Sequence, residues 1–235
     1  MKYELYYWAE IQGRGEFVRL VLEDADCEYV DVVREPNGYE QLQAVLSGKR
    51  DGVLPFAPPV LYAGTIVVAQ TAAITSFLGA RHGLAPSSEA GRMAALTIAL
   101  TIADLVAEVH DTHHPIAVDK RYETQKPAAL ERAAAFRRAR LAKFLGYLEN
   151  NLERNGEVLV GSEVSYVDLA AFQVVEGLSY AFPRAMAKAS GSIPRLLALR
   201  DRVAQRPRLL RYLTSPRRLP FNEQGIFRHY EELDS

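Results

Sequence analysis

Two adjacent tyrosines near the start of the chain are the side chains best placed to do chemistry. Tyr6 and Tyr7 end an aromatic-rich stretch that is typical of a strand, and a turn with two glycines and Arg14 follows. From residue 16 onward, apolar side chains recur at helical spacing, so the turn leads into a helix. A helix N-terminus presents unpaired N–H groups and a partial positive charge, which favour a bound anion. A phenol at this place would act on such an anion.

The residues alone leave open which tyrosine does so. Successive side chains of a strand point to opposite faces, so Tyr6 and Tyr7 cannot both face the turn. Aromatic residues are also enriched in strands, so a purely structural role for both stays open as well.

Composition excludes some classes of function. The 235 residues include 28 basic and 29 acidic side chains, a net charge of −1 that argues against a dedicated nucleic-acid binder and gives no reason to invoke a membrane surface. Cys27 is the single cysteine, so no internal disulfide forms and a cytoplasmic protein is expected. We find no signal peptide and no apolar run near the ~20 residues of a spanning helix.

The elements that must position the tyrosines are of mixed α/β type in the first 80 residues. A strand before the turn, a helix over 16–26 and a strand over 28–33 form a βαβ unit, which favours a parallel pair. A short helix near 39–46, a strand ending at Tyr62, a strand over 65–68 and a helix over 72–78 follow. Gly79 is predicted to be the C-cap of that last helix.

The remainder of the chain is predicted to be helical. Helices are expected over 90–113, 124–153, 166–180, 193–205 and 207–213. Ser165 and Asp168 have the spacing of a capping box at the start of a helix that is apolar nearly all round. The tail 214–235 is too apolar for a disordered end, and we expect it to cover a cleft.

Three histidines raise the question of a metal. His110, His113 and His114 share a helix face, as metal ligands can. No H-E-x-x-H motif accompanies them, so we expect no metal, and these side chains would line a substrate cavity or end the helix.

Four groups of residues resemble the cytosolic glutathione transferase superfamily, in its tyrosine-type (sigma, mu, pi and alpha-like) classes, and a bacterial member is expected. They are Leu5-Tyr6-Tyr7-Trp8 with Gly13–Arg19, Pro58-Pro59-Val60-Leu61 with Gln70–Ile74, Asp104, and Gly161 with Ser165 and Asp168. Together they cover the chain to about residue 213. The resemblance implies an α+β thioredoxin-like N-terminal domain (1–80), a linker (81–90), an all-α helical-bundle C-terminal domain (91–213), the tail, and a homodimer.

The resemblance also assigns the tyrosine. Trp8 matches the aromatic residue that follows the catalytic tyrosine in this family, so Tyr7 is expected to donate a hydrogen bond to the glutathione thiolate. Lowering a thiol pKa by ~2 units takes ~2.7 kcal/mol, and one charge-assisted hydrogen bond supplies roughly 1.5–3 kcal/mol. Arg14 would support the thiolate, although the turn is one residue longer than in some classes.

Other residues would bind glutathione by the same resemblance. A cis Pro59 would present the backbone of Val60, Gln70 and an N-cap Thr71 would hold the γ-glutamyl end, and Asp104 would reach the ligand's α-amino group across a dimer interface. The predicted glutathione-binding set is Trp8, Lys49, Arg50, Pro59, Val60, Gln70, Thr71 and Asp104, with Arg50 or Lys49 on the glycyl carboxylate. The predicted second-substrate cleft is Tyr6, His110, Tyr180 and Phe221.

The implied function is a cytoplasmic glutathione transferase in detoxification, with glutathione as co-substrate and an apolar electrophile as second substrate. A glutathione-dependent isomerase, reductase or peroxidase would use the same thiolate. A non-catalytic protein of the same fold that binds glutathione or apolar ligands is the alternative from another class. Ala57, where the family often has a polar side chain, keeps that alternative open.

Overall fold

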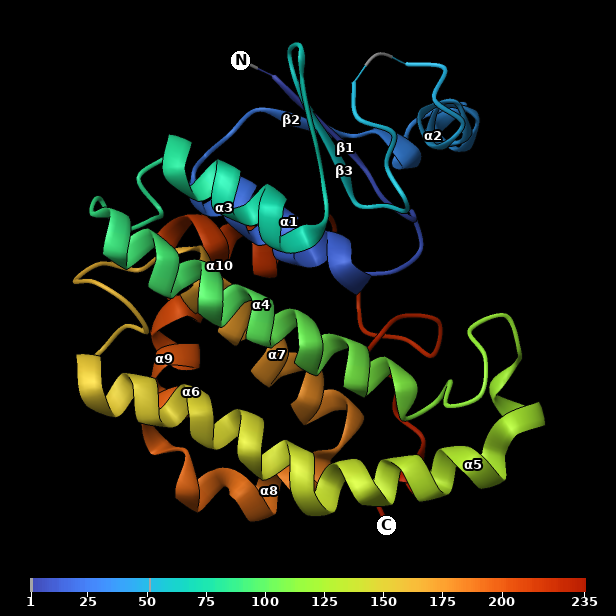
Figure 1. Ribbon diagram of the computed structural model, residues 1–235, viewed down its shortest axis with the longest axis vertical. Coiled ribbons are helices and arrows are strands. Elements are labelled where there is room, and N and C mark those ends of the chain that lie inside the picture. Colours follow the sequence, from blue (N-terminus) through green and yellow to red (C-terminus); the bar gives the residue numbers. More distant parts are fainter. Residues whose placement is uncertain (1, 51) are drawn as a thin grey trace.

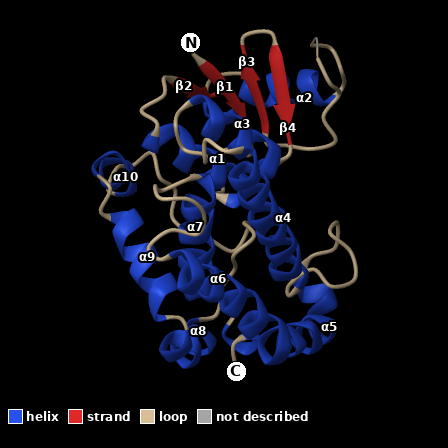
Figure 2. Ribbon diagram, turned by 60° about the vertical axis from the view of Figure 1, so that its left-hand side comes forward, coloured by secondary structure: helices blue, strands red, loops and turns tan. Residues whose placement is uncertain are grey.

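A four-stranded mixed sheet forms the centre of the N-terminal part of the chain (Figure 2). The computed structural model describes residues 2–50 and 52–235. The strands lie in the order β2-β1-β3-β4, with bounds β1 Tyr3–Tyr6, β2 Tyr29–Asp31, β3 Val60–Ala63 and β4 Ile66–Ala69. The β1 and β2 strands are parallel, and the other pairs are antiparallel. The thioredoxin-like unit followed by a helical domain is therefore confirmed.

Helices cover both faces of this sheet (Figure 1). On one face lie α1 (Gly13–Asp24) and α3 (Thr71–Arg81), packed against each other, and on the other lies α2 (Gly38–Leu46). Alternation along β1 sends Leu5 into the core beneath α1 and Tyr6 into a separate core beside α2. The core on the α1 side is continuous with that of the helical domain, so the sheet and the helices form one packed body.

The C-terminal part is all helical and is organised around α7 (Tyr166–Ala181), which is buried on nearly every side. Around it lie α4 (Glu89–Asp111), α5 (Tyr122–Ala135), α6 (Leu141–Asn155), α8 (Pro183–Ala189), α9 (Pro194–Ala204) and α10 (Pro207–Leu213). The predicted central position of the helix 166–180 is confirmed.

A capping box fixes the start of α7, as predicted. One carboxylate oxygen of Asp168 accepts hydrogen bonds from the backbone N–H and the hydroxyl of Ser165, both at 2.8 Å. The other accepts the N–H of Leu159, also at 2.8 Å. The buried carboxylate thus connects the preceding loop to the helix that it caps.

Two expectations about helices were wrong, and one helix was missed. The single helix over 124–153 is interrupted by a π-helical turn at Phe136–Arg140, where the ring of Phe136 is fully buried and lies 5.7 Å from that of Phe182. Gly79 is not a C-cap, because α3 continues to Arg81. A Cβ at Gly79 would lie 2.7 Å from the Tyr166 ring, so glycine allows close packing there. Helix α8 was not predicted.

The α4 helix also departs from expectation. Its 23 residues are long and apolar enough to cross a membrane by length and composition, so the statement that no stretch approaches that length was wrong. One face of α4 packs on α3 and α7. Leu100, at the middle of the other face, is 52% exposed.

The tail 214–235 runs from the N-terminal unit to the far end of the helical domain (Figure 1, red). The side-chain amide of Gln12 donates to the carbonyl of Leu219 at 2.5 Å. Further along, the ring of Tyr230 stacks on that of Tyr122 at 3.9 Å, and the N–H of Arg184 donates to Asp234 at 2.6 Å. The tail is therefore anchored at both ends.

Candidate functional site

The phenol of Tyr7 lies against the turn that begins α1. Its side chain is 3% exposed, and its oxygen accepts a hydrogen bond from the backbone N–H of Arg14 at 2.7 Å. Because the N–H is the donor in this contact, the phenol's own proton stays available for another acceptor. The extra residue in the turn does not prevent the contact.

Two glycines allow this approach. Gly13 has φ +46°, and a Cβ there would lie 2.1 Å from the Tyr7 oxygen. A Cβ on Gly15 would lie 2.5 Å from the Tyr7 ring. No side chain fits at either distance, so the glycines are needed to place the helix N-terminus on the phenol.

Electrostatics keep Tyr7 protonated. Burial raises the pKa of Tyr7, while the N–H of Arg14 and the charges of Arg14 and Arg19 partly offset that rise. The guanidinium carbon of Arg19 lies 5.8 Å from the centre of the Tyr7 ring. At neutral pH the side chain is therefore a neutral phenol that can donate a hydrogen bond.

Tyr6, expected in the second-substrate cleft, lies on the other side of the sheet. Its fully buried ring packs edge-on against Tyr62, and its hydroxyl donates to Glu4 at 2.8 Å. The prediction that Tyr6 lines the cleft was wrong, because strand alternation turns it toward α2.

The two cations proposed for a glycyl carboxylate are differently placed. The guanidinium of Arg50 pairs with Glu4 at 2.9 Å, contacts the hydroxyl of Tyr6, and lies 4.1 Å from the centre of the Tyr62 ring. Lys49 is exposed beside α2. Arg50 would have to exchange its carboxylate partner to bind a ligand there.

The segment around β3 and α3 has several predicted features. The Pro58–Pro59 bond is cis, as expected, and Val60 begins β3. Gln70 has φ +73° and is the N-cap of α3, so the assignment of the N-cap to Thr71 was wrong. The hydroxyl of Thr71 is buried and has no hydrogen-bond partner among the described residues. An unpartnered buried hydroxyl at a helix N-terminus is suited to a polar ligand atom.

A cavity of about 420 Å³ adjoins this hydroxyl. That volume lies within the range of small-molecule sites. Its polar lining is Arg14, Gln70, Thr71 and Thr75, and its apolar lining comes mainly from α4. Trp8 does not line it; the indole stacks on Tyr39, with the ring centres 6.4 Å apart. The cavity thus combines one cation, a helix N-terminus and an apolar wall.

The tail fills the region predicted for the second substrate. The rings of Tyr180 and Phe221 are stacked 5.1 Å apart, and Phe227 lies edge-on to Phe221. Between Phe221, Phe227 and Gly13 the free volume is about 10 Å³, too small for a substrate.

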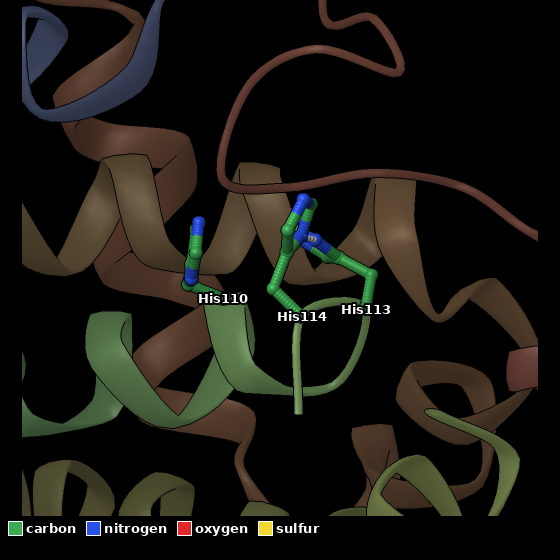
Figure 3. Close-up of side chains that lie close together, drawn as sticks. All are labelled: His110, His113 and His114. Carbon is green, nitrogen blue, oxygen red and sulfur yellow. Dashed lines mark hydrogen bonds between the residues drawn. The ribbon is translucent and has the colours of Figure 1, made fainter. Parts of the chain in front are cut away.

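His110 lies instead in a cluster with His113 and His114 (Figure 3). Burial lowers the pKa of His113 to about 2 and that of His110 to about 4, and the charge of Arg228 acts in the same direction. All three imidazoles are therefore neutral at pH 7, since burial also lowers the pKa of His114.

Sequence reasoning missed a buried ion network beneath Tyr7. Arg19 is fully buried, donates to Asp31 at 2.7 Å and lies 3.4 Å from the carboxylate of Glu16. The hydroxyl of Tyr212 donates to that carboxylate at 3.0 Å. The i, i+3 spacing of Glu16 and Arg19 could have predicted an ion pair on one helix face, but it does not show that both side chains are buried.

Comparisons with known proteins point to one family. Residues 110–216 match the family model described as the C-terminal domain of glutathione S-transferase. A glutathione S-transferase of Plasmodium falciparum is 25% identical over 219 residues, covering 90% of this chain and 94% of the relative. A relative from Plasmodium yoelii yoelii with the same name is 23% identical and covers 87% of this chain and 90% of the relative.

Solved structures share the fold. The pi-class glutathione S-transferase of Onchocerca volvulus has a TM-score of 0.73 at 23% identity, covering 96% of this chain and 99% of that one. Prostaglandin synthase D of Nilaparvata lugens has a TM-score of 0.72 at 21% identity, covering 94% and 100%. These relatives are eukaryotic and lend no support to the expected bacterial source.

The glycine turn generates a stability prediction. Gly13→Ala should lower the free energy of unfolding by about 1–3 kcal/mol, because the new methyl group overlaps the Tyr7 oxygen and the residue has a positive φ. Urea denaturation followed by circular dichroism measures it. Gly146→Ala is the matched control: it lies within α6 with nothing within 4 Å of the added Cβ, and should be neutral or stabilising. Equal effects of the two changes would contradict the packing described for Tyr7.

Proposed function

We propose that this chain, which belongs to the cytosolic glutathione transferase superfamily, is a glutathione transferase whose Tyr7 ionises the glutathione thiol for attack on an apolar electrophile. The observation that carries the proposal is the Tyr7 oxygen, which accepts the Arg14 N–H and keeps its own proton free at the N-terminus of α1. A sulfur atom beside this oxygen would accept that proton in a hydrogen bond, and the thiolate would be favoured over the thiol.

One hydrogen bond from Tyr7 supplies enough free energy to ionise the glutathione thiol near neutral pH. A glutathione thiol with the ordinary pKa of ~8.5 is only about 3% thiolate at pH 7. One hydrogen bond to the charged sulfur contributes roughly 1.5–3 kcal/mol, which is a pKa change of about one to two units. The N-terminus of α1 and the positive charge of Arg14 add to this stabilisation.

Glutathione would lie along the edge formed by β3 and α3. The backbone of Val60, after the cis Pro59, can pair with the cysteinyl part of the peptide. The γ-glutamyl carboxylate would take the Thr71 hydroxyl and the N-terminus of α3, with Gln70 beside it. For the glycyl carboxylate we propose Lys49, or Arg50 after release from Glu4.

The first test replaces the phenol. Tyr7→Phe should lower kcat/KM with glutathione and a chloronitrobenzene roughly ten- to hundredfold, and raise the pKa of bound glutathione by about one to two units, because one hydrogen bond to the thiolate is lost. Steady-state kinetics and the ultraviolet absorbance of the thiolate measure these changes. Tyr6→Phe is the matched comparison and should leave the thiol pKa unchanged. A Tyr7→Phe enzyme with wild-type rate and thiol pKa would sink the assignment.

The second test separates binding from folding. Thr71→Val should weaken glutathione binding about tenfold without lowering the free energy of unfolding, because the hydroxyl has no partner to lose within the described residues. Isothermal titration calorimetry gives the affinity and urea denaturation the stability. Thr97→Val, on α4, removes a hydroxyl bonded only to its own helix backbone and serves as control. Unchanged affinity in Thr71→Val would remove this residue from the site.

We also propose a homodimer. The outer face of α4 exposes Met93 and Leu100, and the loop before the cis proline exposes Phe56 at 95%. Apolar side chains exposed on this scale indicate a protein interface. Asp104, exposed on the same helix, would then approach the α-amino group of glutathione bound to the other subunit.

A charged substitution on the outer face of α4 tests whether this face is the interface. Leu100→Glu should give a monomer in sedimentation equilibrium, because a carboxylate at the centre of an apolar interface would be buried without a partner. Leu210→Glu, at a similarly exposed position on α10, should leave the assembly unchanged. A dimeric Leu100→Glu protein would exclude this face as the interface.

A second candidate function is glutathione or apolar-ligand binding without turnover. The observation in its favour is the tail, which leaves about 10 Å³ where a second substrate would sit next to Gly13. Retention on immobilised glutathione with no activity on a panel of electrophiles and peroxides would favour binding, whereas turnover of an electrophile would favour the transferase. The same panel separates conjugation from isomerase, reductase or peroxidase activity; a cytoplasmic role in detoxification is proposed with the transferase.

A further inference from the structure

We propose that His110, His113 and His114 form a binding site for one divalent transition-metal ion, of the kind that prefers imidazole ligands: Zn²⁺, Ni²⁺ or Cu²⁺. The three side chains come from the last turn of α4 and the segment directly after it (Figure 3). Their ligand atoms all lie within 4.8 Å of one another. The proposal does not depend on glutathione binding or on Tyr7.

The spacing of the residues builds a tripod. Residues i, i+3 and i+4 of a helix lie on one face, and the chain keeps a helical course just past the end of α4. The ring centres of His110 lie 5.1 Å from His113 and 4.9 Å from His114, and those of His113 and His114 lie 4.8 Å apart. Three imidazoles from one short segment thus converge, and two of them are buried.

The hydrogen bond that His113 makes to the tail leaves its Nδ1 free to bind a metal. Its Nε2 lies 2.8 Å from the carbonyl oxygen of Ile226 in the tail. A carbonyl can only accept, so Nε2 carries the proton and Nδ1 carries the lone pair. Metal-binding histidines are commonly oriented in this way, by a ring N–H donated to a backbone carbonyl. The lone pair of His113 points at Nδ1 of His114.

A hydrogen bond joins His113 and His114, and a metal ion would take the place of its proton. Their Nδ1 atoms lie 2.5 Å apart, shorter than an ordinary N–H···N contact. Two Zn–N bonds of ~2.0–2.1 Å at a tetrahedral angle would set these nitrogens ~3.3 Å apart. His110 would move inward to complete the set; its nearest ion-pair partner, Asp111, is 4.0 Å away, so no hydrogen bond between them opposes the motion. The adjustments are up to about 1.5 Å, the difference between the 4.8 Å within which the ligand atoms lie and the ~3.3 Å of a bound set.

Surrounding charges select the type of ion. The charge of Arg228 acts on all three imidazoles and that of Arg14 on His110, which opposes any cation. Arg228 is fixed to the tail, because it donates to the carbonyls of Gly225 and Gln224. Asp111 offers the nearby negative charge, shared with Arg132 at 3.7 Å. Strong nitrogen bonding must therefore supply the affinity, which favours Cu²⁺, Ni²⁺ and Zn²⁺ over Mg²⁺ and Ca²⁺.

Three protein ligands leave one coordination position open for water or another small ligand. Because His113 is bonded to the tail at Ile226, a metal at this place would also fix the segment that fills the cleft next to Gly13. Metal binding should consequently stabilise the fold, since the unfolded chain lacks the preformed tripod.

The test uses tag-free protein stripped with EDTA and titrated with Zn²⁺ by calorimetry, and with Cu²⁺ followed by electron paramagnetic resonance. Wild type should bind one ion per chain with nitrogen hyperfine coupling from several ligands. His110→Gln and, separately, His114→Gln should each weaken binding by at least about tenfold and reduce the nitrogen coupling. The His82→Gln, His229→Gln double variant removes the two other histidines of the chain and should bind as wild type does.

Three results would overturn the proposal. They are wild-type binding that is weak and not stoichiometric, His110→Gln and His114→Gln proteins that bind as tightly as wild type, or a loss of binding in the double control variant. Circular dichroism of each variant, compared with wild type, establishes that weaker binding comes from the missing ligand and not from unfolding.

Discussion

The hydrogen bond from the Arg14 N–H to the Tyr7 oxygen is the contact on which the rest of the site depends. It fixes the phenol as an acceptor toward the protein and so as a donor toward a ligand. It requires glycine at positions 13 and 15, because either Cβ would collide with the Tyr7 side chain. It also sets the N-terminus of α1 beside the phenol, where the helix dipole favours a thiolate. This one contact thus leaves the Tyr7 proton free for a ligand and places the positive end of the α1 dipole beside it.

A buried network supports that contact from below. Arg19 lies fully buried between Asp31, Glu16 and the Tyr7 ring. The hydroxyl of Tyr212, on α10, donates a second hydrogen bond to the carboxylate of Glu16. Buried charges contribute little net stability but cannot be removed singly without leaving an unpaired charge. The network therefore links α1 to β2 through Asp31 and to the helical domain through Tyr212. The tail joins it as well, through Arg218 at 3.7 Å from Glu16.

The sequence predicted the features that follow from local chemistry. The strand-turn-helix around Tyr7, the capping box of Ser165 and Asp168 and the position of α7 depend on residue type and spacing, and all were confirmed. The features that depend on tertiary packing were not predictable. Gly79 has the appearance of a cap but serves close packing on Tyr166, and Arg50 has the appearance of a free cation but pairs with Glu4. Phe221 and Phe227 fill the cleft because the irregular tail folds back over it. A segment without helical or strand periodicity gives no sequence signal for such a path.

The central claim is that the Tyr7 proton is directed at the sulfur of bound glutathione. A crystal structure with glutathione tests it most directly. The account predicts the sulfur within about 3.5 Å of the Tyr7 oxygen, with that oxygen still accepting the Arg14 N–H. A sulfur atom beyond hydrogen-bonding reach of Tyr7, or held by a different donor, would contradict it.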